Sequence, residues 1–523
     1  MLTYDDLPGT VNVATWFVDR NLNEGNASRS ALITGDTVTS YGELAAHINR
    51  AGNVLRELGV GRGDRVLLAL NDGVEFVALW YGAQKIGAVT AEVYTYLQPK
   101  DYAYFLRYTG ASVVVVDGST LDPVRRAADG LAVTLLAVGV PDGDLRPGEQ
   151  AYELLAAGAP DELDAAKTGR DDVTIWKFTT GSTGEPKACV HPTHSAVLSF
   201  EWYARGVLDI GQDDVVLPVP KLFFGYARDL TALYPFGVGG AGIAFPDRTT
   251  PERIFELIAR HRPTILVNVP TMMSAMVAHP DAAKQDMSSL RLCTSAGEAL
   301  PAGLHRKWTE TFGVEVVDGI GSSEAYHIYI SNRPGQGRPG TVGQVVPGYT
   351  ARVVDDEGRT LPDGQIGTLE VTGATVALEY YGAPDKTART FDGDTLRSED
   401  LFERDPDGFF RYRGRADDLL KVGGIWVAPS EIEHCLIGHE DVVECAVIGR
   451  ADEAGLVRPR AFVVPRPSGS AELEGALREY VRSQLAPYKV PRDVVFVNEL
   501  PKTANGKLDR RALRTADEEG TPA

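Results

Sequence analysis

The sequence contains few cysteines and no apolar run long enough for a membrane span. Its four cysteines, Cys189, Cys293, Cys435 and Cys445, include no Cys-x-x-Cys pair, so neither a disulfide framework nor a zinc site is supported, and buried reduced thiols are expected. The first residues show neither a basic segment nor an apolar segment of the kind found in signal peptides. We therefore expect a cytoplasmic protein that does not span a membrane.

Positive charge is also scarce. The chain has 52 lysines and arginines against 72 aspartates and glutamates, a net charge of −20, which argues against a nucleic-acid or anionic-membrane surface. A small acidic substrate stays compatible with this charge, because a few buried cations can bind it locally. The length of 523 residues, of which 43% are hydrophobic, predicts at least two domains with large cores.

The order of the predicted elements defines the fold class. From about residue 29 to 270, strands such as 65–70, 112–116 and 173–178 alternate with helices such as 73–86, which predicts parallel-rich βαβ sheets. After residue 340, short strands and turns predict an antiparallel subdomain in the form of a small β-barrel. The last hundred residues predict a small α+β domain, with a capping box at 430–433 and a disordered tail from Thr515.

A second helix in the first region has clear boundaries. Thr250 and Pro251 have the residue types of an N-cap and a first helical position, and Pro263 ends the helix before a strand at 265–267.

One polar stretch directly follows the predicted strand at 173–178. Its candidate phosphate-binding residues are Thr179, Thr180, Gly181, Ser182, Thr183, Gly184 and Lys187. Backbone N–H groups, hydroxyls and an ammonium at a strand end suit nucleotide phosphates, and we expect a helix soon after them. The Walker spacing fails, because Lys187 follows Pro186 and precedes Ala188. A polar surface loop is the alternative.

Further polar motifs follow at long range. They contain Gly297, Glu298 and Ala299; then Asp318, Gly319, Gly321, Ser323 and Glu324; then Ser398, Glu399 and Asp400; then Arg415, Asp417, Lys421, Gly423 and Gly424; and finally Lys507. A strand-to-helix turn or a surface charge run explains each motif taken alone. Such turns and charge runs do not explain the whole set in this order.

Taken together, these motifs resemble the acyl-adenylate-forming superfamily of acyl-CoA synthetases, adenylation domains and luciferases. The resemblance implies ATP, Mg²⁺ and coenzyme A as cofactor and co-substrates. By the same resemblance, residues 295–299 line the adenine, Asp318, Gly319 and Ser323 belong to the nucleotide site, and Glu324 ligates Mg²⁺. Asp400 binds the ribose, and Arg415 lies beside the nucleotide. Asp417 is implied as the hinge of a mobile small α+β domain, which divides the chain into domains at 1–416 and 417–523. Lys421, Gly423 and Gly424 face the thiol step, and Lys507 reaches the reacting carboxylate and the α-phosphate.

The sequence departs from the superfamily at one of these motifs. Ser398-Glu399-Asp400 stands where the superfamily usually has Thr-Gly-Asp. The hydroxyl and the aspartate are kept, so ribose binding is expected to persist. The effect of Glu399 on the local turn stays open, because glutamate lacks the conformational freedom of glycine.

Longer matches resemble the benzoate-CoA ligases over nearly the whole chain, including residues 220–227, 264–272, 319–334 and 417–427. By position, an aryl slot is implied that contains Phe224, Gly225, Tyr226, Gly321, His327 and Ile328. Core packing is the alternative for the aromatic residues among them. The polar atoms of Tyr226 and His327 are available to a ring substituent. Gly225 stands where alanine is common and Arg228 where the family tends to be apolar, which favours a hydroxy- or amino-benzoate, or a bulkier acid, beside benzoate itself.

The predicted function is therefore an ATP-dependent aryl-CoA ligase that forms an acyl-AMP and releases AMP and pyrophosphate. One alternative is an aryl-adenylating enzyme that loads a carrier protein, and another is a coenzyme A ligase for a bulkier acid of a biosynthetic pathway. A catalytically silent nucleotide-binding scaffold is disfavoured, because Lys187, Glu324, Asp400, Arg415 and Lys507 are all present. The oligomeric state, a homodimer included, stays open.

Overall fold

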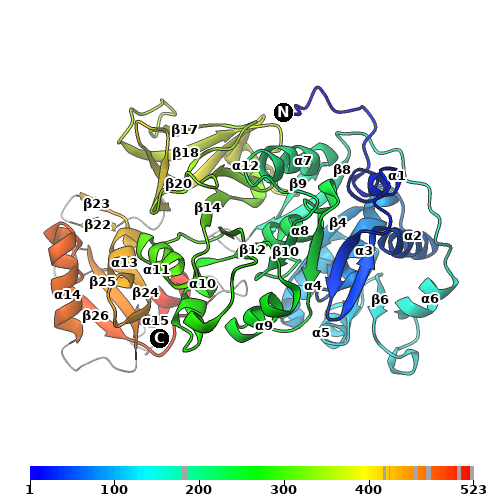
Figure 1. Cartoon of the computed structure of the whole chain (residues 1–523), viewed down its shortest axis with the longest axis horizontal. Coiled ribbons are helices and arrows are strands. Elements are labelled where there is room, and N and C mark those ends of the chain that lie inside the picture. Colours follow the sequence, from blue (N-terminus) through cyan, green and yellow to red (C-terminus); the bar gives the residue numbers. More distant parts are fainter. Residues whose placement is uncertain are drawn as a thin grey trace.

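The computed structural model describes residues 1–179, 185–415, 420–422, 425–451, 457–466, 473–502 and 508–518 and, at residues 421, 425 and 426, the backbone alone. Two large sheets lie in the N-terminal part of the chain, and the C-terminal elements gather at one end of the molecule (Figure 1).

The first large sheet has seven strands in the order β7-β6-β5-β3-β4-β8-β9. They are β3 (Arg65–Ala69), β4 (Val89–Glu92), β5 (Val113–Asp117), β6 (Thr134–Val138), β7 (Gln150–Ala151), β8 (Val173–Thr179) and β9 (Lys187–Pro192). All pairings are parallel except that of β8 with β9. The predicted strands at 65–70, 112–116 and 173–178 are thereby confirmed.

The second large sheet has nine strands in the order β16-β15-β14-β13-β12-β10-β11-β1-β2. They are β1 (Ser30–Thr34), β2 (Thr37–Ser40), β10 (Val215–Pro218), β11 (Ala241–Ala244), β12 (Ile265–Asn268), β13 (Leu292–Ser295), β14 (Val316–Gly321), β15 (Ile328–Ser331) and β16 (Gln344–Val345). The pairings from β1 to β14 are parallel, and β2, β15 and β16 add antiparallel edges. The parallel-rich prediction is confirmed.

Helices cover both faces of these sheets. Those of the N-terminal part are α1 (Arg20–Asn23), α2 (Tyr41–Glu57), α3 (Val74–Lys85), α4 (Pro99–Thr109), α5 (Leu121–Ala127), α6 (Tyr152–Gly158), α7 (Thr193–Ser199), α8 (Gly225–Ala232), α9 (Pro251–His261), α10 (Pro270–Ala278) and α11 (Ala302–Phe312). The predicted start of α9 is confirmed, because Thr250 Oγ1 accepts the Arg253 N–H at 3.3 Å and Pro251 takes the first helical position.

The alternating direction of side chains along the strands explains how helices and sheets form layers. Val66 of β3 and Ile265 of β12 belong to one core that also contains residues of α2, α3 and α8. The neighbouring Leu67 packs in a second core with residues of α4 and α5, and Leu266 packs in a third with residues of α9 and α10. Because successive strand residues point to opposite faces, the helices α2, α3 and α8 lie in a layer that both sheets share.

A third sheet is antiparallel, as predicted. Its strands are β17 (Thr350–Val354), β18 (Ile366–Thr372), β19 (Phe391–Asp392), β20 (Thr395–Arg404) and β21 (Phe410–Arg415), and α12 (Pro384–Thr390) precedes β19. The prediction of a closed small barrel differs from the described pairings, which run β17-β18-β20 and then add both β19 and β21 to β20. Besides β18, the long strand β20 pairs with β19 near its start and with β21 near its end. The described strands therefore form an open sheet.

The C-terminal part is α+β, as predicted. It contains β22 (Leu420–Val422), β23 (Ile425–Val427), α13 (Pro429–Ile437), β24 (Val442–Ala451), β25 (Val457–Pro465), α14 (Leu473–Gln484), β26 (Asp493–Phe496) and α15 (Arg510–Glu518). The predicted capping box at 430–433 is wrong, because α13 begins with Pro429 after an Ala428 N-cap that makes no side-chain capping bond. The Glu433 carboxylate instead accepts the Val447 N–H at 2.6 Å.

The predicted disordered tail also begins too early. Residues 515–518 belong to α15, where the Asp517 carboxylate pairs with Arg450 at 3.3 Å and with Arg460 at 3.1 Å.

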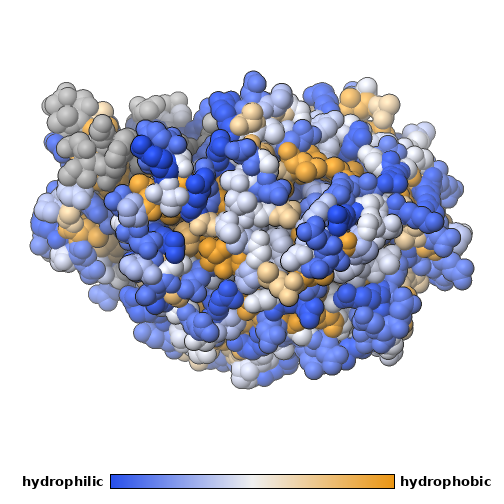
Figure 2. Space-filling view, turned by 90° about the horizontal axis from the view of Figure 1, so that it is seen from above, coloured by the Kyte–Doolittle hydropathy of each residue, from blue (hydrophilic) through white to orange (hydrophobic). Residues whose placement is uncertain are grey.

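The surface carries no large apolar area on the face drawn in Figure 2, where hydrophilic side chains surround small separate hydrophobic ones. Exposed large hydrophobics such as Val38, Leu154 and Ile366 lie on different elements, which is ordinary for soluble proteins. No helix in the described part of the chain is long and apolar enough to cross a bilayer. The four cysteines are free thiols, and all but the partly exposed Cys435 are buried.

Candidate active site

The candidate phosphate loop joins two paired strands. In the register of β8 with β9, Thr179 lies opposite Lys187, so both ends of the loop are held together. Thr180, Gly181, Ser182, Thr183 and Gly184 lie outside the described residues. The expectation of a helix soon after the loop is wrong: β9 comes first and α7 begins only at Thr193. The reason is that residues 188–192 are buried and complete the sheet beside β8.

The predicted adenine segment follows β13. Gly297 has φ +88°, which glycine adopts without strain. A Cβ at this position would lie 3.8 Å from the Phe224 ring, so the segment lies beside the predicted acyl segment. The Glu298 carboxylate accepts the Thr271 N–H at 3.1 Å and the Thr271 hydroxyl at 2.7 Å. These bonds tie the segment to the start of α10. Ala299 is half-buried beside them.

Strand β14 supplies the next group of predicted residues. Asp318 is buried, and burial raises the pKa of its carboxyl well above the ordinary value. Gly319 lies on the same strand opposite Ser331 of β15. At Gly321 a Cβ would lie 2.3 Å from the His327 carbonyl oxygen, so only glycine lets the chain return this closely after the turn.

Glu324 lies in the short turn that follows β14. One of its oxygens, Oε1, accepts the Tyr380 hydroxyl at 2.7 Å, and the neighbouring Ser323 hydroxyl donates to the Phe178 carbonyl of β8 at 3.2 Å. No group of three His, Cys, Asp or Glu side chains within the described ranges could hold a metal ion. The half-buried Glu324 carboxylate fits a Mg²⁺ that takes its remaining ligands from phosphate and water.

The predicted ribose and nucleotide residues face each other on two strands. Asp400 of β20 lies opposite Arg415 of β21. The doubt about a turn at Glu399 is resolved, because this residue lies within the extended strand β20 and needs no glycine conformation. Its carboxylate forms an ion pair with the Arg415 guanidinium. The backbone N–H of Asp400 donates to the Ser398 hydroxyl at 3.2 Å.

The predicted aryl slot gathers around the start of α8. Phe224 and Gly225 are half-buried there, and Ile328 is buried in β15. The hydroxyl of Tyr226 lies 2.7 Å from the Thr294 hydroxyl, and its role toward a ring substituent stays a prediction.

His327 is the second polar residue predicted for the slot. Its Nε2 lies 3.3 Å from the Tyr226 carbonyl oxygen, and the rings of Tyr203, Tyr226 and Tyr234 lie 5.0 to 5.7 Å from its own. Burial lowers the pKa of His327 to about 3, so the imidazole is neutral at pH 7. A neutral ring that donates Nε2–H to a carbonyl keeps Nδ1 as an acceptor, and Nδ1 has no hydrogen-bond partner among the described residues.

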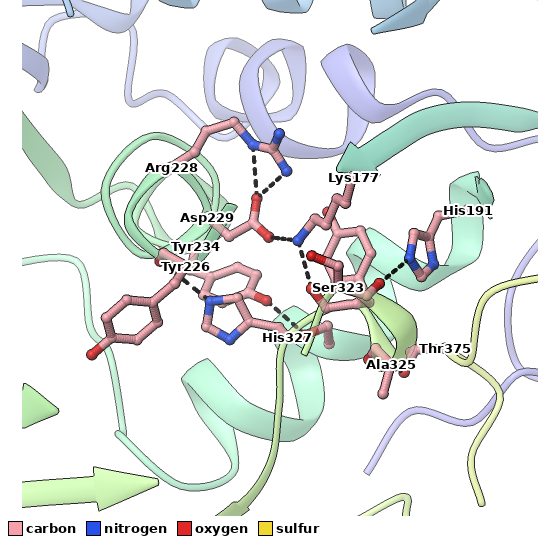
Figure 3. A network of polar contacts seen from close by, with 12 residues as sticks. Lys177, His191, Tyr226, Arg228, Asp229, Tyr234, Ser323, Ala325, His327 and Thr375 are labelled. Atoms are coloured by element: carbon pink, nitrogen blue, oxygen red, sulfur yellow. Dashed lines mark hydrogen bonds and ion pairs between the residues drawn. The ribbon is translucent and has the colours of Figure 1, made fainter. Parts of the chain in front are cut away.

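A buried charge network beneath the slot was missed by the sequence analysis (Figure 3). Lys177 of β8 pairs with Asp229 of α8 at 2.5 Å, and Arg228 pairs with Asp229 at 2.7 Å. Arg228 also pairs with Glu92 of β4 at 2.7 Å. Although burial opposes it, Arg228 and Lys177 hold the pKa of Asp229 below its usual value. The signal in the sequence is a charged residue inside each apolar run, because a buried charge needs a partner.

This network corrects two predictions about the slot. Arg228 is turned into the ion pairs, so it is not a polar group available to the acid. The space left by the missing methyl group at Gly225 is filled by the Lys177 side chain, whose Nζ would lie 3.1 Å from a Cβ at that position. Neither residue therefore provides room for a bulkier acid.

Several predicted residues cannot be placed. The hinge Asp417, the thiol-step glycines Gly423 and Gly424, the side chain of Lys421 and the catalytic candidate Lys507 lie outside the described residues. Of the remaining candidates, Thr179 ends β8, residues 297–299 follow β13 and Glu324 follows β14. They therefore come from the carboxyl ends of strands, where α/β sheets bind ligands.

Comparison with known proteins shows the family of the chain. The family model of AMP-binding enzymes matches residues 19–381, and that of the AMP-binding enzyme C-terminal domain matches residues 431–507. A benzoate–CoA ligase of Thauera aromatica is 41% identical over 98% of this chain and 97% of its own length. A 4-hydroxybenzoate–CoA/benzoate–CoA ligase of Rhodopseudomonas palustris is 38% identical over 96% of this chain and 94% of its own.

Among solved structures, an anthranilate CoA ligase in complex with anthranoyl-AMP superposes with a TM-score of 0.95. It is 37% identical, and the match covers 99% of both chains.

Proposed function

The chain belongs to the family of AMP-binding enzymes, and we propose that the acid it activates is a benzoate whose ring carries a hydrogen-bond donor. It is an AMP-forming acid–thiol ligase that uses ATP with Mg²⁺ and joins an aromatic acid to coenzyme A. The near-full-length similarity to ligases that act on benzoate and 4-hydroxybenzoate supports the benzoate class.

The ring substituent is argued from His327. A buried acceptor without a partner costs free energy, and Nδ1 of the neutral His327 is such an acceptor. A hydroxyl or amino group on the ring would supply the missing donor, whereas unsubstituted benzoate would not. The similarity to an anthranilate ligase bound to its amino-substituted adenylate is consistent with this chemistry.

The proposed roles of the site residues follow the two half-reactions. In the first, the acid carboxylate attacks the α-phosphate of ATP and pyrophosphate leaves. Glu324 supplies an oxygen ligand to Mg²⁺, which neutralises phosphate charge when bound, and Lys507 neutralises the carboxylate and the α-phosphate. In the second, the coenzyme A thiolate attacks the acyl carbon and AMP leaves. We place the domain boundary at 416/417, with rotation about Asp417 between the two steps.

The test is acid-dependent ATP–pyrophosphate exchange, followed by kcat/KM for benzoate and for its hydroxy and amino derivatives. We expect exchange with benzoates and the highest kcat/KM for a donor-bearing ring. A preference for unsubstituted benzoate would contradict the role given to His327, and no exchange with any benzoate would contradict the substrate class.

A carrier protein stays the alternative acceptor. Thioester formation with free coenzyme A is expected. Failure with coenzyme A but success with a phosphopantetheinylated carrier protein would select the alternative.

A further inference from the structure

Four charged side chains are buried together beneath the aryl slot, and the reaction described above uses none of them. Lys177, Asp229, Arg228 and Glu92 expose at most 5% of their side chains. Two cations face two carboxylates, so the group carries little net charge. Lys177 is the member whose ammonium also contacts the turn at Tyr326 (Figure 3).

Lys177 holds a strained turn. Its ammonium donates to the Tyr326 carbonyl at 2.6 Å and lies 3.6 Å from the centre of the Tyr326 ring. Tyr326 has φ +74° and ψ −54°, a strained conformation that a non-glycine residue keeps only where its surroundings hold it. Burial lowers the pKa of Lys177 to about 8, so the ammonium is mainly charged at pH 7.

The turn at Tyr326 connects two parts of the site. Tyr326 is the second residue after Glu324 and directly precedes His327. Its backbone conformation therefore sets the direction of the Mg²⁺ ligand on one side and of the aryl-slot imidazole on the other.

Lys177 also contacts the wall of the slot. Its side chain lies against Gly225, the first residue of α8, and its own position is two residues before Thr179 at the start of the phosphate loop. One ammonium thus contacts the acyl helix and the Glu324–His327 turn from the strand that leads into the phosphate loop.

We propose that Lys177 is a positioning residue for the ligase reaction: by holding the Tyr326 turn, it aligns Glu324 with Mg²⁺ and His327 with the aromatic acid at the same time. This inference rests on the proposed function of the site. It predicts that loss of the ammonium weakens the use of acid and of Mg²⁺ together, although Lys177 contacts neither.

The test compares Lys177→Met with Lys85→Met. The Lys85 side chain is as buried as that of Lys177, at 5% exposed, and it pairs with the partly exposed Asp19 at 2.8 Å. It is in no described contact with the site residues named above, so it controls for the loss of a buried ammonium. For Lys177→Met we expect the KM for the acid and the Mg²⁺ concentration for half-maximal rate each to rise about tenfold, because the turn relaxes and must be realigned when the ligands bind. A tenfold rise corresponds to about 1.4 kcal/mol. The KM for coenzyme A should stay unchanged.

The double variant Lys177→Met/Asp229→Asn guards against misfolding, because it leaves no carboxylate without its cation. It still lacks the donor to Tyr326, so it should show the same joint rise. The inference is overturned if either Lys177 variant changes only thermal stability, as Lys85→Met should, or raises one constant without the other. Absence of acid-dependent exchange in the wild-type enzyme would instead contradict the proposed function.

Discussion

The acid side and the nucleotide side of the site are built differently. On the acid side, His327 is buried among tyrosine rings, and the Lys177, Asp229, Arg228 and Glu92 network beneath it is at most 5% exposed. On the nucleotide side, Arg415 and Glu399 form their ion pair with 34% and 51% of their side chains exposed. The acid side is thus held by buried contacts in the absence of a ligand, whereas this ion pair of the nucleotide side is open to solvent.

The difference follows from what each side binds. A neutral aromatic ring offers few polar contacts, so its slot must hold its shape through its own packing and ion pairs. A nucleotide brings several charges. Exposed charged side chains can leave water or each other and bind phosphate instead, because an exposed ion pair contributes little free energy. Substitutions on the acid side are therefore expected to change mainly the free energy of unfolding, and substitutions on the nucleotide side mainly the kinetic constants.

The largest effect on stability is expected for Arg228→Met. It leaves Glu92 and Asp229 with fewer cationic partners, and breaking a buried pair in this way costs about 3–5 kcal/mol of unfolding free energy. Arg415→Met, which breaks an exposed pair, should cost less than about 1 kcal/mol. Urea denaturation of both variants measures the difference. Similar losses of unfolding free energy in the two variants would contradict the difference proposed between the two regions.

Lys507→Ala tests how the nucleotide side is completed. Loss of one group that stabilises transition-state charge lowers a rate by about 10²–10³, and we expect this loss for adenylate formation. Conversion of supplied acyl-adenylate to thioester should persist, because the proposed rotation removes Lys507 from the site in that step. Single-turnover assays of the two steps provide the measurement.

A control for this variant lies in the same segment. Lys502 pairs with Glu444 on the surface at 2.9 Å, so Lys502→Ala should leave both half-reactions unchanged. Equal loss of both steps in Lys507→Ala would contradict the rotation about Asp417.

The contrast also explains what the sequence could predict. Strands with runs of β-branched residues, such as β8, and helices with a clear cap, such as α9, were predicted correctly, because their determinants are local. The nucleotide motifs were recognisable for the same reason, since each is a short contiguous pattern. The helix expected soon after the phosphate loop was wrong, because pairing with β8 made residues 187–192 a strand.

The buried network could not be predicted in the same way. Its members come from positions 92, 177, 228 and 229, and only the packing of β4, β8 and α8 brings them together. Arg228 taken alone was therefore interpreted as a group of the acid slot. Gly225 was likewise interpreted as extra space, because the side chain that fills it lies 48 residues earlier in the sequence.

His327→Gln tests a smaller effect on the acid side, the loss of stability at low pH that the buried neutral imidazole causes. The folded protein holds the His327 pKa at about 3, below its ordinary value of 6.5. As the pH falls from 6.5 toward 3, the unfolded chain binds a proton that the folded chain does not, so stability is lost. The cost is at most about 1.4 kcal/mol per pH unit. The variant lacks this titration, and its unfolding free energy should fall less between pH 7 and pH 4. Parallel curves for the two proteins would contradict a buried neutral imidazole.

The smallest effect is expected for Glu399→Gln on the nucleotide side. An exposed ion pair contributes about 0–1 kcal/mol, so unfolding should change little. The Glu399 carboxylate competes with nucleotide phosphate for Arg415, and removing its charge should lower the KM for ATP about twofold to fivefold. Because salt screens exposed charges, the difference should shrink as ionic strength rises. If the KM for ATP rises instead, Glu399 orients Arg415 for the nucleotide. This surface ion pair would then hold its side chains in place before the ligand binds, as the buried network does.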